Sequence, residues 1–174
     1  MVTTSDQRPV VLVGPPGAGK STIGEALAAA LDVAFHDTDA AIEEAQGCSI
    51  SDIFVLEGEP AFRALERAEV ARAVAAERGV VALGGGAPMD ESTQRALAGH
   101  TVIFLDVGIA DAAKRVGFDG SRPLLAINPR AAWTKLMNER RPTYEAVATH
   151  RVDTAGRSIE DVVAQIVEAL GEQA

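Results

Sequence analysis

The sequence predicts an α/β protein in which helices cover both faces of a parallel β-sheet. Short apolar runs rich in β-branched residues alternate with amphipathic segments along the chain. Strands separated by helices in this way are typical of βαβ units, and therefore of parallel sheets. No linker, repeat or low-complexity tract interrupts this alternation, so we expect a single domain over residues 1–174.

The first half of the chain is expected to contain two strands and four helices. The first apolar run ends at Gly14, and the segment after it has apolar residues at helical spacing. Gly47 breaks a helix, and either Ser49 or Ser51 is a candidate N-cap for the next one. The expected strands are residues 10–13 and 33–36, and the expected helices are residues 21–31, residues 40–44, one through 54–56 that ends before Gly58, and residues 59–77.

The second half continues the alternation and contains one long irregular segment. Residues 118–128 include Gly120 and Pro123 and have no periodicity, and loops of this kind are often lids over a site. The last helix carries several acidic residues and no basic one, so we expect it to form a solvated outer face. The expected strands are residues 80–83, 101–105 and 150–153, and the expected helices are residues 91–98, 109–116, 130–139 and 158–170.

Composition and charge exclude several classes of protein. The chain has 174 residues, of which 47% are hydrophobic, so it can bury a substantial core. A net charge of -9 argues against general nucleic-acid binding, because Lys and Arg hold a phosphate backbone. Cys48 is the only cysteine, which fits a reducing compartment, and no apolar run is long enough to span a membrane. We therefore expect a cytoplasmic protein whose partners are small molecules.

A phosphate-binding motif follows the first strand. Residues 14–21 read Gly-Pro-Pro-Gly-Ala-Gly-Lys-Ser, which matches G-x-x-x-x-G-K-[ST] at every fixed position. The glycines let backbone N–H groups face phosphate oxygens, Lys20 supplies a cation, and the Ser21 hydroxyl can ligate Mg²⁺. The alternative is a Gly/Pro-rich turn that happens to precede a lysine, but the flanking strand and helix favour a P-loop. GTPases, motors and small-molecule kinases all carry this motif, so it does not name a reaction.

Two acidic residues follow the second expected strand, where open α/β sheets bind their ligands. Asp37 could orient a Mg²⁺-bound water. Asp39 could hydrogen-bond an acceptor hydroxyl and take its proton. The alternative for Asp39 is an N-cap of the next helix, and the two roles are compatible.

A run of glycines and an arginine form further candidates for an acceptor site. Gly84, Gly85 and Gly86 end the third expected strand, where they suit either a close approach of the backbone to a ligand or a flexible turn. Arg63 shares a helix face with Glu66, three residues on. Such an arginine could be held by Glu66 and grip a carboxylate with two bonds, although the spacing alone favours a surface pair with Glu59 and Glu66.

Three more arginines and one tryptophan lie in the second half of the chain. Arg122, in the irregular segment, could reach a transferring phosphoryl group when a lid closes. Arg140 and Arg141 stand at an expected helix end, where compensation of the helix dipole is the alternative role. Trp133 is the only tryptophan, and it suits either a core position or a reporter of lid closure.

Taken together, these motifs resemble the shikimate kinase family, and in particular its actinobacterial members. The resemblance extends from residue 10 to about residue 157 and implies a nucleoside-monophosphate-kinase-like, three-layer P-loop NTPase fold. It implies a five-stranded parallel sheet in the order 2-3-1-4-5. The motifs in family order are residues 14–22, 37–39, 49–54, 62–66, 84–86, 122–124 and 140–144.

The resemblance also implies a reaction and a set of site residues. ATP, with Mg²⁺ as cofactor, would phosphorylate the 3-hydroxyl of shikimate in the route to chorismate and aromatic amino acids. The enzyme would act as a monomer. An acceptor-binding helical region would span about 39–66 and a lid about 118–128. Lys20, Asp39 and Arg122 would be catalytic, and Glu66 would orient Arg63. The implied ATP site is Gly14, Gly17, Ala18, Gly19, Lys20, Ser21, Thr22, Arg115, Arg122 and Arg157, of which Arg115 and Arg157 would flank the adenine. The implied shikimate site is Asp39, Arg63, Gly84, Gly85, Gly86 and Arg140, with Phe54, Phe62 and Leu124 on its apolar side.

Two other functional classes compete with this interpretation. Another small-molecule kinase, such as a gluconate kinase, would share the fold and the P-loop, but Arg63, the three glycines and Arg140 disfavour it. A nucleotide-dependent switch without chemistry is the second. The chain lacks an Asn/Thr-Lys-x-Asp guanine-binding motif, which counts against a GTPase.

Overall fold

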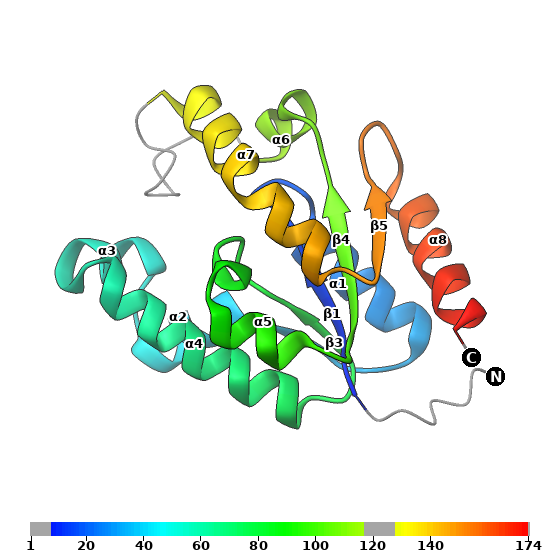
Figure 1. The fold of residues 1–174 in the computed structure, drawn as a ribbon, viewed down its shortest axis with the longest axis horizontal. Coiled ribbons are helices and arrows are strands. Elements are labelled where there is room, and N and C mark those ends of the chain that lie inside the picture. The colour runs from blue at the N-terminus through cyan, green and yellow to red at the C-terminus, as the bar shows by residue number, and fades with distance from the viewer. Residues whose placement is uncertain (1–7, 117–127, 174) are drawn as a thin grey trace.

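The computed structural model describes residues 8–116 and 128–173. Its centre is a five-stranded parallel sheet in the order β2-β3-β1-β4-β5, which confirms the predicted fold class and strand order. Helices lie on both sides of the sheet (Figure 1). The strands are β1 (Val10–Val13), β2 (Phe35–Asp37), β3 (Val80–Ala82), β4 (Thr101–Asp106) and β5 (His150–Asp153).

The helices surround the sheet in several groups. α1 lies behind the sheet as Figure 1 is drawn and packs against α8, which lies beside β5, and α7 crosses in front of the sheet. α2, α3 and α4 pack together as a separate group at one side. The helices are α1 (Lys20–Leu31), α2 (Thr38–Gln46), α3 (Ile50–Glu57), α4 (Glu59–Ala76), the 3₁₀ turn η1 (Ala87–Met89), α5 (Glu91–Leu97), α6 (Ile109–Val116), α7 (Pro129–Val147) and α8 (Ile159–Glu172).

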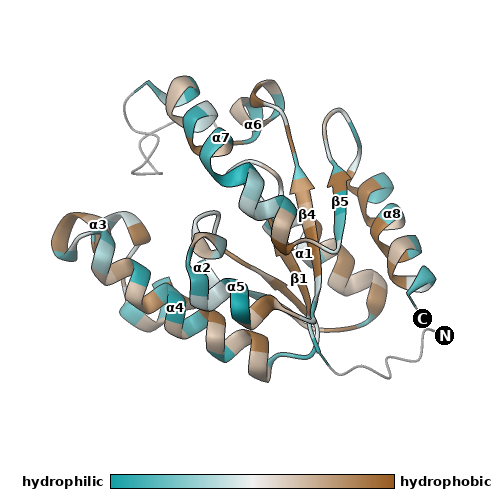
Figure 2. Ribbon diagram, viewed as in Figure 1, coloured by the Kyte–Doolittle hydropathy of each residue, from teal (hydrophilic) through white to brown (hydrophobic). Residues whose placement is uncertain are grey.

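The main core forms on the two faces of the sheet. β1 and β4 are almost wholly buried, because each lies between two other strands and under helices on both sides. Figure 2 shows these strands as hydrophobic, while the outer helices carry polar residues. A smaller apolar cluster of Ile42, Ile53 and Phe62 holds α2, α3 and α4 together. Within the described part of the chain, no helix is both long and apolar enough to cross a membrane.

Several helix boundaries differ from the sequence-based expectations. Asp37, not Asp39, caps α2: its Oδ1 accepts hydrogen bonds from the N–H groups of Asp39 and Ala40, at 2.9 and 3.2 Å. The N-cap role considered for Asp39 is therefore wrong, and Asp39 lies in the first helical turn. Of the two serines considered for α3, Ser49 is the cap.

α7 is longer than expected. It was predicted to end near residue 139, but it continues through Pro142 to Val147. The buried ring of Tyr144 packs on Phe104 of β4, with 5.2 Å between ring centroids, and this packing outweighs the hydrogen bond that proline removes. Arg140 and Arg141 are therefore inside a helix, and the proposed compensation of a helix terminus is wrong. Arg141 instead forms an ion pair with Asp106, at 2.7 Å.

The last helix is solvated on one side only. Its acidic residues Glu160, Asp161 and Glu168 are exposed, as expected. Val162, Val163 and Ile166 lie on the opposite side, are buried, and pack this helix against the sheet and α1.

Candidate active site

Two cavities meet at the carboxyl end of the sheet. The first, called here the P-loop cavity, has a volume of about 540 Å³ and lies over residues 16–23. The second, the arginine cavity, has a volume of about 360 Å³ and contains Arg63 and Arg140. Pro16, Ser21, Asp37, Asp39 and Gly85 line both of them. A group bound in one cavity would therefore meet a group bound in the other beside Asp39.

The P-loop joins β1 to α1. Gly17 and Gly19 have φ angles of 84° and 87°, which residues with a Cβ rarely adopt. Lys20 folds back over the loop, and its Nζ donates hydrogen bonds to the carbonyls of Gly14 and Pro15, at 2.8 and 3.0 Å. Gly17, Gly19, Lys20, Ser21 and Thr22 line the P-loop cavity, whereas Gly14 and Ala18 are buried beneath it.

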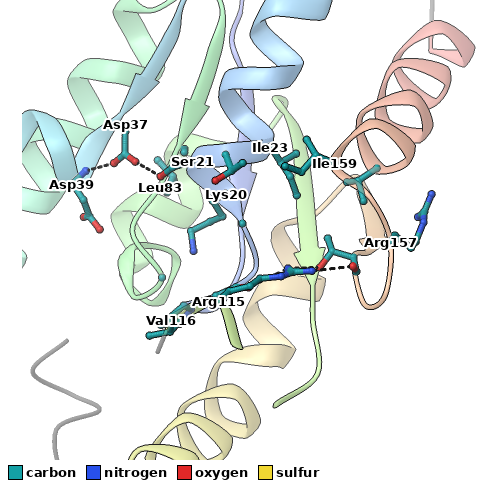
Figure 3. A pocket seen from close by; sticks show the side chains of 18 of the residues that line it. Lys20, Ser21, Ile23, Asp37, Asp39, Leu83, Arg115, Val116, Arg157 and Ile159 are labelled. Atoms are coloured by element: carbon teal, nitrogen blue, oxygen red, sulfur yellow. Dashed lines mark hydrogen bonds between the residues drawn. The ribbon is translucent and has the colours of Figure 1, made fainter. Parts of the chain in front are cut away.

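The end of β2 brings an oxygen ligand next to Ser21. The Ser21 hydroxyl donates to Asp37 Oδ2 at 2.6 Å (Figure 3). Mg²⁺ prefers oxygen ligands and usually keeps waters while binding one or two protein groups plus substrate phosphates, so this pair fits it. Among the residues that the structure describes, no group of three or more His, Cys, Asp or Glu side chains could hold a metal by itself.

Arg63 is held from two sides in α4. Its Nη1 donates to Glu66 Oε1 at 2.8 Å, and its Nη2 lies 3.3 Å from Glu59 Oε1. Both the surface pair and the orienting contact weighed from the sequence are therefore present. Glu66 is 3% exposed, and its burial raises the pKa of its carboxyl, although the charges of Arg63 and Arg140 oppose that rise. Glu66 is thus a buried anchor that fixes the guanidinium at the cavity.

Arg140 reaches the same cavity from α7. It is only 8% exposed, and no carboxylate of the described residues lies within ion-pair distance of it. A buried guanidinium that has no carboxylate at ion-pair distance is a strong site for an anion. Four residues on, the Tyr144 hydroxyl donates to the carbonyl of Gly85 at 2.5 Å, and burial raises the pKa of Tyr144 to about 12.

The three glycines are required for space and not for unusual backbone angles. None of them has a φ in the left-handed region. A Cβ on Gly84 would lie 2.6 Å from Asp39 Oδ1, and one on Gly86 would lie 2.5 Å from Arg63 Nη1. The segment opens the turn η1, where the N–H of Ala87 donates to the carbonyl of Gly84 at 3.1 Å. It therefore lets charged side chains approach the end of β3 closely.

Arg115 and Arg157 lie on the opposite side of the P-loop cavity from Asp37 (Figure 3). Arg115 donates to the carbonyls of Gly17 and Ala18, at 3.1 and 3.2 Å, and to Thr154. Arg157 donates to the carbonyls of Asp153 and Asp161. Arg122, Leu124 and the proposed lid up to residue 127 lie outside the described residues.

Comparisons with known proteins identify the family. The family model described as Shikimate kinase matches residues 16–171. The chain belongs to the shikimate kinase family. It is 54% identical over 163 residues to a shikimate kinase of Rhodococcus jostii (strain RHA1), covering 93% of this chain and 97% of the relative. A shikimate kinase of Salinispora arenicola (strain CNS-205) is 53% identical over 160 residues, covering 92% and 96%. The resemblance to actinobacterial shikimate kinases is thus confirmed.

Solved shikimate kinases share the architecture. The shikimate kinase from Acinetobacter baumannii, solved in complex with shikimate, matches with a TM-score of 0.93 and 31% identity, covering 98% of this chain and 96% of that one. The enzyme from Aquifex aeolicus gives a TM-score of 0.82 at 30% identity, covering 95% and 97%. A gluconokinase from Sinorhizobium meliloti 1021, covering 97% and 98%, gives 0.56 at 19%, and that likeness extends to the fold alone.

Some residues at the site were not predicted from the sequence. Leu136 lines the arginine cavity, and Thr154 lines the P-loop cavity. Trp133 is 3% exposed, and its indole N–H donates to the carbonyl of Pro16 in the P-loop at 2.8 Å. The core position considered for Trp133 is correct, but the contact with the P-loop was not foreseen. Nothing in the local sequence of a shikimate kinase links residues 133 and 16, because only the packing of α7 brings them together.

Proposed function

We propose that the chain transfers the γ-phosphate of ATP to the 3-hydroxyl of shikimate, giving ADP and shikimate 3-phosphate. Its membership of the shikimate kinase family supports this reaction. The observation that carries the residue assignments is the junction of the two cavities at Asp39, with a P-loop on one side and, on the other, the buried Arg140 and the half-buried Arg63. That arrangement suits an anionic acceptor with a hydroxyl group next to a nucleotide.

The P-loop cavity holds ATP in this proposal. Lys20 leaves the carbonyls of Gly14 and Pro15 and contacts the β- and γ-phosphates, while the loop N–H groups bind phosphate oxygens. Ser21 holds Mg²⁺ directly and Asp37 orients one of its waters, which the 2.6 Å contact between them supports. When bound, Mg²⁺ neutralises negative charge on the phosphate oxygens. The adenine lies between Arg115 and Arg157.

The arginine cavity holds the acceptor. Arg63 and Arg140 clamp its carboxylate, because both guanidinium groups reach this cavity and Arg140 has no ion-pair partner among the described residues. Gly84, Gly85 and Gly86 lie along one side, and Phe54 and Phe62 give an apolar side, their ring centroids 5.2 Å apart.

The chemical step is an in-line displacement at the γ-phosphorus. The acceptor oxygen forms a bond to phosphorus while the bond from phosphorus to the β–γ bridging oxygen breaks, and the electron pair leaves with ADP. Asp39 receives the proton of the acceptor hydroxyl, which its position between the two cavities supports. Lys20 stabilises the charge that develops on the transferring group.

The proposal also covers the lid, the acceptor-binding region and the cellular setting. Arg122 joins the phosphates when residues 118–128 close as a lid, and residues 39–66 form the acceptor-binding region of a single kinase domain. The protein acts as a monomer in the cytoplasm, in the route to chorismate, where its single thiol at Cys48 stays reduced.

A coupled assay of ADP release tests the function. Shikimate, gluconate, a set of nucleoside monophosphates and a blank without acceptor are compared at the same ATP and Mg²⁺ concentrations. We expect release with shikimate well above all the others. Equal release in the blank would indicate an ATPase or switch, and preferred turnover of gluconate would contradict the assigned acceptor.

A further inference from the structure

One face of α7 presents several side chains to the two cavities. Trp133, Arg140 and Tyr144 follow one another at intervals of seven and four residues, which places them on the same side of the helix. All three are buried. The proposed mechanism uses Arg140 alone, so the contacts of the two aromatic residues call for a separate explanation.

Trp133 makes its polar contact in the P-loop. A buried indole N–H usually finds a hydrogen-bond acceptor, and here that acceptor is the carbonyl of Pro16, 2.8 Å away. Pro16 lines both cavities. This bond therefore connects α7 to the point at which the nucleotide and the acceptor would meet.

The bond from Trp133 also fixes the direction of an N–H group. A trans peptide is planar, so its C=O and N–H point in opposite directions. The described residues contain no cis peptide, so the N–H of Gly17 points away from Trp133. Gly17 lines the P-loop cavity, and no hydrogen bond among the described residues uses its N–H. That donor is therefore available to a phosphate oxygen.

Tyr144 makes the equivalent contact at the other cavity. Its hydroxyl donates to the carbonyl of Gly85 at 2.5 Å, so the N–H of Gly86 points away from Tyr144. Gly86 lines the arginine cavity, and its N–H is likewise unused by the hydrogen bonds of the described residues. Tyr144 is fully buried, which fixes the hydroxyl in one place.

We propose that Trp133 and Tyr144 are positioning residues. Through them, α7 orients one backbone N–H group toward each substrate. Trp133 sets the Gly17 N–H for the phosphates of the nucleotide, and Tyr144 sets the Gly86 N–H for the acceptor. The identity of the two ligands rests on the proposed function. Because both aromatic residues lie on one rigid helix, with Arg140 between them, α7 also fixes the distance between the two binding loops.

Two substitutions separate the contacts. Trp133→Phe and Tyr144→Phe each remove one hydrogen-bond donor and keep an aromatic ring in place. We expect Trp133→Phe to weaken the binding of ADP with Mg²⁺ about fivefold, the effect of one neutral hydrogen bond, and to leave the affinity for shikimate nearly unchanged. Tyr144→Phe should give the opposite pattern. Isothermal titration calorimetry with each ligand alone measures both affinities.

A matched control distinguishes positioning from general stability. Met137 is buried on the same face of α7 and makes no hydrogen bond to either loop, so Met137→Ala should lower Tm and leave both affinities unchanged. Equal losses for both ligands in the two Phe variants, or no loss in either, would overturn the positioning role. Failure of the wild-type protein to bind shikimate would instead overturn the proposed function, and the titration of Trp133→Phe with ADP would still test the P-loop contact.

Discussion

The P-loop cavity and the arginine cavity are built in different ways. The phosphate-binding part of the P-loop cavity is made of consecutive residues between β1 and α1, and their backbone N–H groups supply most of the expected phosphate contacts. The arginine cavity depends on side chains from α2, α4 and α7 around the glycines after β3. A backbone cradle recognises any nucleotide phosphate, whereas a set of converging charges selects one acceptor. The comparison therefore predicts different effects of substitution in the two regions.

Substitution of Lys20 should have the largest effect and spare the other cavity. Lys20→Met removes the cation that would stabilise charge on the transferring phosphoryl group, so turnover should fall by about a hundredfold or more. Binding of shikimate alone should be unaffected, because Lys20 does not line the arginine cavity. ADP release and calorimetry measure the two quantities, and near-normal turnover would contradict the catalytic role of Lys20.

Asp39 tests the junction of the two cavities. Asp39→Asn keeps the size of the side chain but removes its capacity to take a proton, so we again expect turnover to fall by about a hundredfold or more with the fold intact. Because Asp37 and not Asp39 caps α2, the melting temperature should change little. An Asp39→Asn enzyme with near-normal turnover would rule out the role as proton acceptor.

The carboxylate clamp gives the next largest effect. Replacing the acceptor's carboxylate with a neutral group should weaken binding by about 2–5 kcal/mol, because the buried Arg140 and the half-buried Arg63 would both lose this anion. Arg63→Ala should weaken the acid far more than this neutral analogue. Equal losses for both compounds would mean that Arg63 serves only its ion pairs on α4.

The same variant has a pH signature in its stability. Burial raises the pKa of Glu66 above its unfolded value, so its contribution to the free energy of unfolding falls as pH rises past the usual carboxyl pKa. Arg63 opposes that rise, and its removal should enlarge the effect. The Tm difference between Arg63→Ala and wild type should therefore be larger at pH 8 than at pH 5. Arg67→Ala, which loses a more exposed pair with Asp90, is the control and should show no such widening.

Gly86 tests whether the glycines provide space. A Cβ there would lie 2.5 Å from Arg63 Nη1, so Gly86→Ala should displace the guanidinium and weaken acceptor binding by about tenfold, with nucleotide binding unchanged. Gly171→Ala is the control, because nothing lies within 4 Å of a Cβ at that position. Titration of each ligand distinguishes the variants, and an unchanged acceptor affinity in Gly86→Ala would show that the loop has room to move.

The smallest expected effect is a change in fluorescence. Trp133 is the only tryptophan and contacts the P-loop, so nucleotide should alter its emission by roughly ten per cent or more, and acceptor alone by less. Emission spectra at saturating ADP, shikimate and both ligands test this order. Unchanged emission with nucleotide would contradict a P-loop that shifts against α7.

The sequence alone determined the fold class, the strand order through the family resemblance, and the P-loop. The fold class and the P-loop depend on local patterns. These are β-branched runs, helical spacing, and a motif of eight neighbouring residues in which Gly17 and Gly19 adopt backbone angles that other residues rarely take. The order of the site motifs along the chain was also readable, since each motif is a short group of neighbouring residues.

Tertiary structure decided which of these residues share a cavity and what holds them there. The spacing of Arg63 and Glu66 alone favoured a surface pair, and only the burial of Glu66 beside Gly84 made it an anchor. The continuation of α7 through Pro142 depended on the packing of Tyr144 against β4. Contacts such as that of Trp133 with Pro16 join residues far apart in the chain, so their energy has no local pattern from which it could be predicted.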